Sequence, residues 1–185
     1  MRMSWLRAAG TCLNPPCPGY PVTMTTPSPY RRQLLATYLR MHLVGAGAGI
    51  RLAELLAGDP WTDGRLDHLP DELANEATFA RGWAASVSGL SESWVPPTFA
   101  LTAGVRRVVA PLRPTRGRFR RVLALEAMRS LVLAKKAMWE LGIALGDDVV
   151  DRDTVEQLRM HDEDAKRQAR TLQELHQRAS SEVFT

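Results

Sequence analysis

Four ionisable side chains fall on or beside the apolar faces that the sequence predicts for its helices: His42, Glu76, His161 and Asp162. Imidazole and carboxylate groups that converge inside a bundle can bind iron, manganese or zinc, so these residues form a candidate metal site. A buried Glu and His can instead hydrogen-bond to each other or to water, because an unpaired buried charge is costly. We favour this second interpretation, since the sequence lacks the Glu-x-x-His motifs of di-metal helical bundles. The sequence therefore predicts no cofactor, with a metal ion as the alternative.

A basic segment precedes and opens one of the predicted helices, with seven arginines and no acidic residue between Val105 and Arg121. These arginines are Arg106, Arg107, Arg113, Arg116, Arg118, Arg120 and Arg121. Such charge can bind a nucleic-acid backbone, but Phe119 is the one aromatic residue within the segment for base stacking. Alternatively, the arginines and the apolar residues around Val108 can anchor an amphipathic segment on an anionic membrane surface. We favour the solvation of an ordinary connecting loop over both.

Nucleophilic catalysis finds no support in the sequence. Cys12 and Cys17 precede the first predicted helix and have no further zinc ligands near them. We interpret them as unpaired thiols in a reducing compartment, which predicts a cytoplasmic protein. No serine lies in a strand-turn-helix elbow, so no catalytic residue is predicted. No uncharged apolar run approaches the ~18 residues that span a bilayer.

Four long helices are predicted from apolar residues that recur every three or four positions. Their expected ranges are 29–57, 66–90, 119–145 and 153–181. Ser28 is a suitable N-cap for the first of them, and Pro29 suits its first helical position. Gly45, Gly47 and Gly49 lie inside this helix and cost ~1 kcal/mol each relative to Ala, which predicts close approach of a neighbouring helix.

The helix predicted at 119–145 is expected to form the main apolar wall of the bundle. Its inner stripe is expected to comprise Ala127, Leu131, Ala134, Met138, Leu141 and Leu145. Glu126, Lys136 and Glu140 share the opposite side, so we interpret Glu126 as a member of a solvated ion-pair row.

The spacing of the helices predicts two hairpins joined by a long connection. Structureless connections of more than ~15 residues are uncommon, so we expect a short amphipathic helix at 98–110. Two hairpins joined by a long crossover make a ferritin-like antiparallel four-helix bundle. The expected organisation is a disordered Pro-rich extension at 1–28, the bundle at 29–181 and a disordered tail at 182–185. Met24 is a second candidate for the start of translation beside Met1.

Several blocks resemble a family of small actinobacterial proteins of ferritin-like four-helix form. These blocks are RRQLLATYLRMHLVGAGAGIRLAELL, the Leu-Glu-Ala-Met at 125–128, and Lys136 three residues before Trp139. The resemblance covers roughly residues 30–179 and implies a fold but no agreed activity. Ala74 and Asn75 stand where those proteins often carry carboxylates, which weakens any inherited metal site.

The expected function is that of a non-enzymatic cytoplasmic structural or interaction protein with a helical-bundle fold. Self-association through helix faces is compatible with this function, and no specific partner is predicted. The first alternative is a degenerate ferritin-like metal protein with a site around His42 and Glu76. The second is peripheral binding to an anionic membrane or to nucleic acid through the arginine-rich crossover.

Overall fold

The computed structural model describes residues 28–88, 117–146 and 150–185 of the chain. These ranges contain four long helices and no strand, so the all-α prediction is confirmed. The helices are α1 (Pro29–Ala57), α2 (Leu69–Ser88), α4 (Arg118–Leu145) and α5 (Arg152–Phe184), with a short 3-10 helix η1 (Pro60–Thr62) after α1. The helix predicted at 98–110 lies outside the described residues, as do the cysteines and nearly all of the predicted N-terminal extension.

Local sequence signals define the starts of α1 and α5. The Ser28 side chain accepts a hydrogen bond from the Arg31 backbone N–H, and Pro29 occupies the first turn of α1. Asp151 caps α5 in the same way, because its carboxylate accepts from the Thr154 backbone N–H at 2.9 Å. Both caps satisfy backbone donors that have no partner inside the helix.

The C-terminal end of α5 corrects the predicted disordered tail at 182–185, since the helix continues to Phe184. The Phe184 ring meets the Phe119 ring edge-on at 6.2 Å between centroids. Glu182 accepts hydrogen bonds from the Trp61 indole N–H at 2.9 and 3.0 Å. These contacts with distant parts of the chain hold the last turn, and no local pattern in the sequence indicates them.

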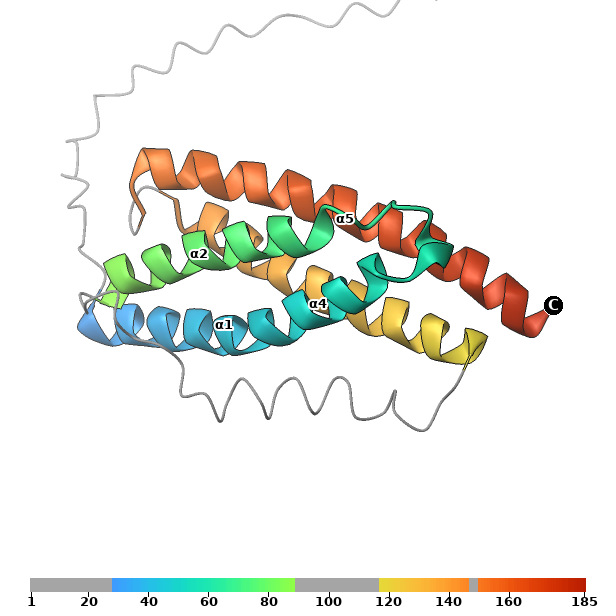
Figure 1. The fold of residues 1–185 in the computed structure, drawn as a ribbon. Coiled ribbons are helices and arrows are strands. Elements are labelled where there is room, and N and C mark those ends of the chain that lie inside the picture. The colour runs from blue at the N-terminus through green and yellow to red at the C-terminus, as the bar shows by residue number, and fades with distance from the viewer. Residues whose placement is uncertain (1–27, 89–116, 147–149) are drawn as a thin grey trace, which may run out of the picture.

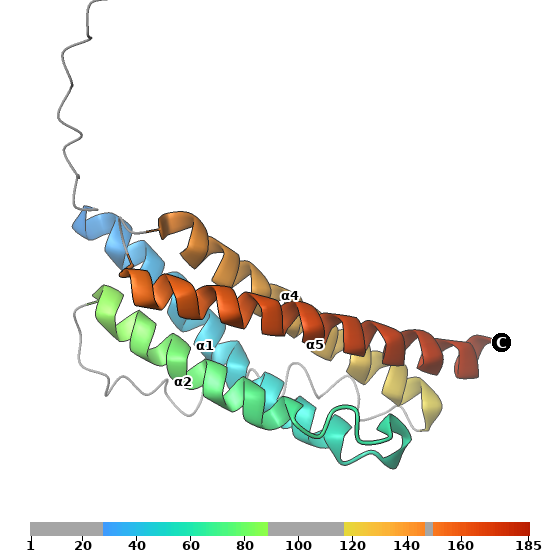
Figure 2. The same ribbon diagram turned by 90° about the horizontal axis from the view of Figure 1, so that it is seen from above.

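The four helices form two hairpins, α1 with α2 and α4 with α5, and the two helices of each hairpin run in opposite directions (Figure 1). Seen from above, α1 lies beside α4 and α2 lies beside α5 (Figure 2). Arg121 near the start of α4 pairs with Asp59 just after α1, and Gly49 lies opposite Met128. The core runs between these helices and includes the fully buried Leu39, Leu125 and Trp139.

The core-facing side of α4 differs from the predicted stripe. Its buried side chains include Leu125, Met128, Val132 and Trp139, whereas Ala134 is exposed. The helix packs against both α1 and α5. Its apolar surface is therefore wider than one stripe and is not centred on the predicted residues. Met138 is buried as predicted, and Glu126 is exposed as predicted.

Gly45 and Gly49 of α1 do not serve the close helix approach that their positions predict. A Cβ built on Gly45 meets none of the neighbouring described residues within 4 Å, and one on Gly49 makes only ordinary contacts at 3.9 Å with Leu131 and Met128. Close approach occurs instead at Gly142 of α4, where a Cβ would lie 2.6 Å from the Trp83 ring. The prediction is therefore wrong for Gly45 and Gly49.

Candidate ligand cavity and buried polar cluster

A cavity of about 310 Å³ lies between α1, α2 and α4. Its lining is mostly apolar and includes Met41 from α1, Ala77 from α2, and Met128 and Val132 from α4. The volume is at the lower end of the range for small-molecule sites in proteins. His42, Glu76 and Lys135 are the lining residues with ionisable side chains. A cavity with apolar walls and a few polar groups is the usual form of a small-molecule site.

Small residues on α1 leave this space unfilled. Gly45, Ala46 and Gly49 all line the cavity. Among the described residues, a Cβ at Gly45 meets no neighbouring side chain or helix within 4 Å, so the space beside α1 is wide enough for a larger side chain. Met41 lies one turn before Gly45 and lines the same cavity, and its relative accessibility is 70 %. The cavity therefore extends to the protein surface at Met41.

A buried ion pair forms the polar part of the cavity wall. The Lys135 ammonium group of α4 donates to a Glu76 carboxylate oxygen of α2 and, at 2.6 Å, to the Gln168 Oε1 atom of α5. Gln168 Nε2 donates to the other Glu76 oxygen at 3.1 Å. Burial lowers the pKa of Lys135, whereas the charge of Glu76 acts in the opposite direction. Three helices are thus connected by one hydrogen-bonded group around Glu76, which is only 3 % exposed.

The cluster continues outward along α2 and α5. Gln168 Nε2 also donates to Glu72 at 2.8 Å, and Arg167 donates to the other Glu72 oxygen at 2.9 Å. The second guanidinium nitrogen of Arg167 donates to Asp164 at 2.7 Å. The polar cluster, defined here as Glu72, Glu76, Lys135, Asp164, Arg167 and Gln168, therefore connects the cavity wall to the α2–α5 surface.

His161 borders the polar cluster from α5. Its ring lies 4.7 Å from the Phe79 ring and is stacked 5.2 Å from the Trp139 ring, measured between centroids. Its buried Nδ1 atom has no hydrogen-bond partner among the described residues. Burial lowers the pKa of His161, while the neighbouring Glu76 and Asp164 partly oppose this shift.

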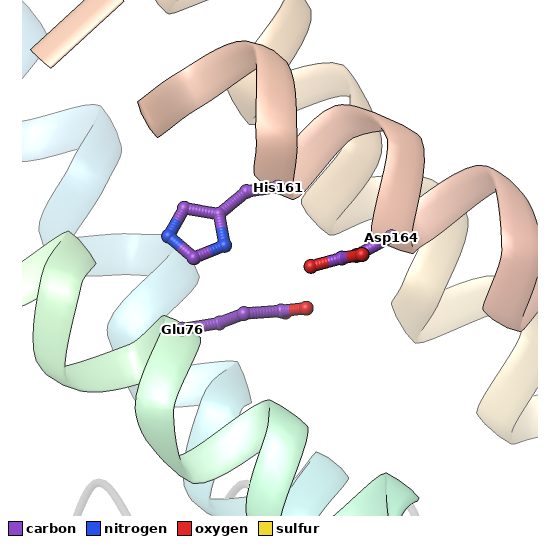
Figure 3. A group of neighbouring side chains, drawn as sticks. All are labelled: Glu76, His161 and Asp164. Atoms are coloured by element: carbon purple, nitrogen blue, oxygen red, sulfur yellow. The ribbon is translucent and has the colours of Figure 1, made fainter. Parts of the chain in front are cut away.

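Glu76, His161 and Asp164 could together hold a metal ion, because each offers a ligand atom and these atoms lie within 4.8 Å of one another. Figure 3 shows the imidazole and the Asp164 carboxylate, both from α5, directed toward Glu76 of α2. Cationic side chains already bind both carboxylates, since Lys135 pairs with Glu76 and Arg167 with Asp164. A metal ion would have to displace these cations.

The four residues of the sequence-predicted metal site do not form a single cluster. His42 and Glu76 both line the cavity, as their positions on the apolar faces predict. The His42 ring, however, contacts the Tyr38 ring, with 4.5 Å between the ring centroids. Asp162 instead pairs with Lys166 at 2.8 Å and lies 3.7 Å from Lys136. Asp164 occupies the position expected of Asp162, because the helix turns it toward Glu76 and His161.

Sequence reasoning missed Lys135, although a signal for it exists. Along α4, the buried Leu125, Met128, Val132 and Trp139 follow alternating steps of three and four residues, and Lys135 occupies the position between Val132 and Trp139 in this series. A lysine within an otherwise apolar stripe indicates a buried partner of opposite charge. Gln168 and Asp164 give no such signal, because α5 carries polar residues on most of its surface.

The predicted basic patch lies largely outside the described residues, which include only Arg118, Arg120 and Arg121 of its seven arginines. Arg121 does not belong to a free basic surface, because its guanidinium pairs with Asp59 at 2.8 Å and lies over the Trp61 ring at 4.5 Å. Its inclusion in the patch is therefore wrong. Among the described helices, none is both long and apolar enough to cross a membrane.

Comparisons with protein-family models, curated proteins and solved structures found no match to this chain.

Proposed function

We propose that this chain is a non-enzymatic helical-bundle protein that binds an apolar small molecule in the cavity between α1, α2 and α4. The observation that carries the proposal is the presence of Gly45 and Gly49 at the cavity wall in the interior of a long helix. Each costs ~1 kcal/mol relative to Ala, and neither makes a contact that Ala would prevent. Their small size keeps the cavity open at a cost in stability.

The connectivity of the helices is compatible with a ferritin-like plan, which we propose as the topology. Residues 89–116 connect the end of α2 to the start of α4, and these two points lie at opposite ends of the bundle (Figure 1). A crossover between two hairpins is the feature that distinguishes this plan from a simple up-and-down bundle.

Octanol is a suitable first probe of the cavity because its alkyl chain is apolar and its hydroxyl group carries no charge. In protein labelled at the methionine methyl groups, we expect octanol to shift the NMR signals of Met128 and Met138, which line the cavity. The signal of Met160 should not move, because this residue is 62 % exposed on α5 and does not line the cavity. If no cavity methionine responds to octanol, the proposed function is wrong.

A cavity-filling variant and a matched control make the test specific. Gly49→Leu is expected to reduce the affinity for octanol by at least about tenfold, because the new side chain occupies the cavity. Gly82→Leu is the control, since Gly82 also lies within a helix and a Cβ there meets none of the described neighbours within 4 Å, but Gly82 does not line the cavity. Equal binding by the wild type and both folded variants would place the octanol site elsewhere and contradict the proposal.

The convergence of Glu76, His161 and Asp164 favours a second candidate function, the binding of iron, manganese or zinc. Metal analysis of protein purified without added metal would test this function. About one ion per chain, lost in His161→Ala, is the expected result if these residues bind metal. Only trace metal in the wild type, with no uptake on reconstitution, would exclude this candidate.

A further inference from the structure

The polar part of the cavity wall indicates the chemical class of the ligand. We propose that the ligand is an amphiphilic amine, whose apolar part fills the cavity and whose ammonium group binds at Glu76. This inference rests on the proposed function and adds a headgroup to it.

The charges around Glu76 favour a cation. The polar cluster contains three carboxylates, from Glu72, Glu76 and Asp164, but only two cationic side chains, from Lys135 and Arg167. All three carboxylates act electrostatically on Lys135 in the same direction, so they share one local environment. The cluster thus carries one negative charge in excess.

The neighbouring His161 does not balance this charge. Its ring packs against the Phe79 and Trp139 rings, and its buried Nδ1 atom has no hydrogen-bond partner among the described residues, so the ring lacks the second acceptor that a charged imidazolium would need. A ligand ammonium would bring the local charge to zero, whereas a ligand carboxylate would add a second excess negative charge. Opposite charge at such a site is favourable and like charge is unfavourable.

Glu76 can also accept further hydrogen bonds. Within the part of the chain that the structure describes, Lys135 donates to one of its carboxylate oxygens and Gln168 donates to the other. A carboxylate offers roughly four acceptor positions, so about two remain for donors on a ligand. An ammonium group supplies three donors, which suits this remaining capacity.

The remainder of the cavity fits the apolar portion of such a ligand. The lining of α1 extends from Met41 to Gly49, which at 1.5 Å per residue is about 12 Å along the helix. On α4 the lining extends further, from Met128 to Trp139. An extended alkyl chain or a small aromatic system matches this elongated apolar space.

Three probes with eight carbon atoms each separate the headgroup from the chain: octylamine, octanol and octanoate. At neutral pH the amine is protonated and the carboxylate ionised. We expect octylamine to bind about tenfold more tightly than octanol, and octanoate to bind more weakly than octanol. The methionine methyl titration gives all three affinities at the same site.

The outcomes distinguish this inference from the proposed function. Octanol binding without any advantage for octylamine would overturn the inference and leave the cavity as an apolar ligand site. Tighter binding of octanoate than of octanol would also overturn it. Failure of all three probes would refute the cavity function itself.

Two variants test the role of the charge. Glu76→Gln preserves the shape of the side chain and should abolish the advantage of octylamine over octanol. Asp164→Asn removes the excess charge at a residue that does not line the cavity, so it should reduce the same advantage without affecting octanol. An unchanged octylamine-to-octanol ratio in either folded variant would contradict the inference, and Asp164→Asn keeps the test valid if Glu76→Gln fails to fold.

Discussion

The surroundings of two helix-interior glycines differ so much that the same substitution should have opposite effects at each. A Cβ at Gly142 would lie 2.6 Å from the Trp83 ring and 2.7 Å from a Leu158 methyl group, and both neighbours are buried. We expect Gly142→Ala to lower the free energy of unfolding by about 1–3 kcal/mol despite the better helix propensity of Ala. Gly45→Ala, where the described residues leave open space, should raise the free energy of unfolding by up to about 1 kcal/mol.

Urea unfolding of the two variants beside the wild type would measure this difference. A stabilising effect of Gly142→Ala would show that Trp83 and Leu158 relax without cost. Gly45→Ala serves as the matched control because it tests helix propensity alone.

Lys135 and Lys136 are adjacent in α4 but differ in burial and in the partner that each side chain contacts. Lys135→Met leaves Glu76 buried without its cation, so we expect a loss of about 3–5 kcal/mol in the free energy of unfolding. Lys136 pairs with the exposed Glu140 one turn away, and Lys136→Met should cost less than about 1 kcal/mol. Urea unfolding of both variants would measure these losses in the free energy of unfolding. Similar losses from both variants would show that Lys135 has no special structural role.

The sequence allowed some of these residues to be placed and not others. Ser28 and Pro29 were predicted correctly because an N-cap depends on the chemistry of one helical turn. The partners of Glu76 were not predicted, because they come from α4 and α5, and their contact depends on how the helices rotate against one another. The choice of Asp162 instead of Asp164 shows how little rotation is needed to exchange one ligand candidate for another.

At the scale of elements, Trp61 connects the α1–α2 turn to the first turn of α4 and to the last turns of α5. Its indole N–H donates to Glu182, and the guanidinium groups of Arg121 and Arg178 lie over its ring at 4.5 and 4.4 Å. A hydrogen bond to a charged group and two cation–π contacts together stabilise this end of the bundle. The helix α5 therefore remains ordered beyond the residue at which its apolar pattern predicts an end.

Removing Trp61 should loosen the last turns of α5. We expect Trp61→Ala to lower the free energy of unfolding by about 2 kcal/mol and to accelerate amide exchange in residues 178–184. Trp61→Phe keeps a ring for the arginines but lacks the indole N–H, so its effect should be intermediate. Unaltered exchange at the C-terminus in Trp61→Ala would show that α5 holds its last turns by itself.

The helix ranges and the burial of α4 show what periodicity can and cannot predict. The range of α1 was correct at both ends, and α4 began within one residue of its predicted start. The core stripe of α4 was misplaced because a single-stripe pattern does not describe a helix that contacts neighbours on two sides. For the glycines of α1, the sequence could not distinguish close packing from empty space, since both require a missing side chain.

For the whole molecule, burial of His42 and His161 links stability to pH. Burial lowers the pKa of each imidazole in the folded chain below its ordinary value of 6.5. Between the folded and unfolded pKa values the unfolded chain binds more protons, so the free energy of unfolding rises with pH there. At His161, the negative charges of Glu76 and Asp164 oppose the lowering of the pKa, and the positive charge of Lys135 adds to it.

We therefore expect the folded state to lose stability as the pH falls below about 6.5, before most carboxylates begin to titrate. Urea unfolding at about pH 7.5 and about pH 5.5 would measure the loss. His161→Phe should show a smaller difference between the two conditions, because Phe can pack against Phe79 and Trp139 without binding a proton. An equal or larger difference in this variant would exclude His161 as a source of the pH dependence.

Three of the side chains around the cavity, Met41, Met128 and Met138, are methionines. Methionine has an unbranched, flexible side chain and a polarizable sulfur, so it adapts to irregular shapes. Such walls distinguish poorly between one hydrocarbon outline and another, because they can repack around each. Discrimination among ligands should therefore come from the rigid, hydrogen-bonded Glu76 and not from shape: this bundle would be tolerant of the chain that it encloses and selective for the headgroup.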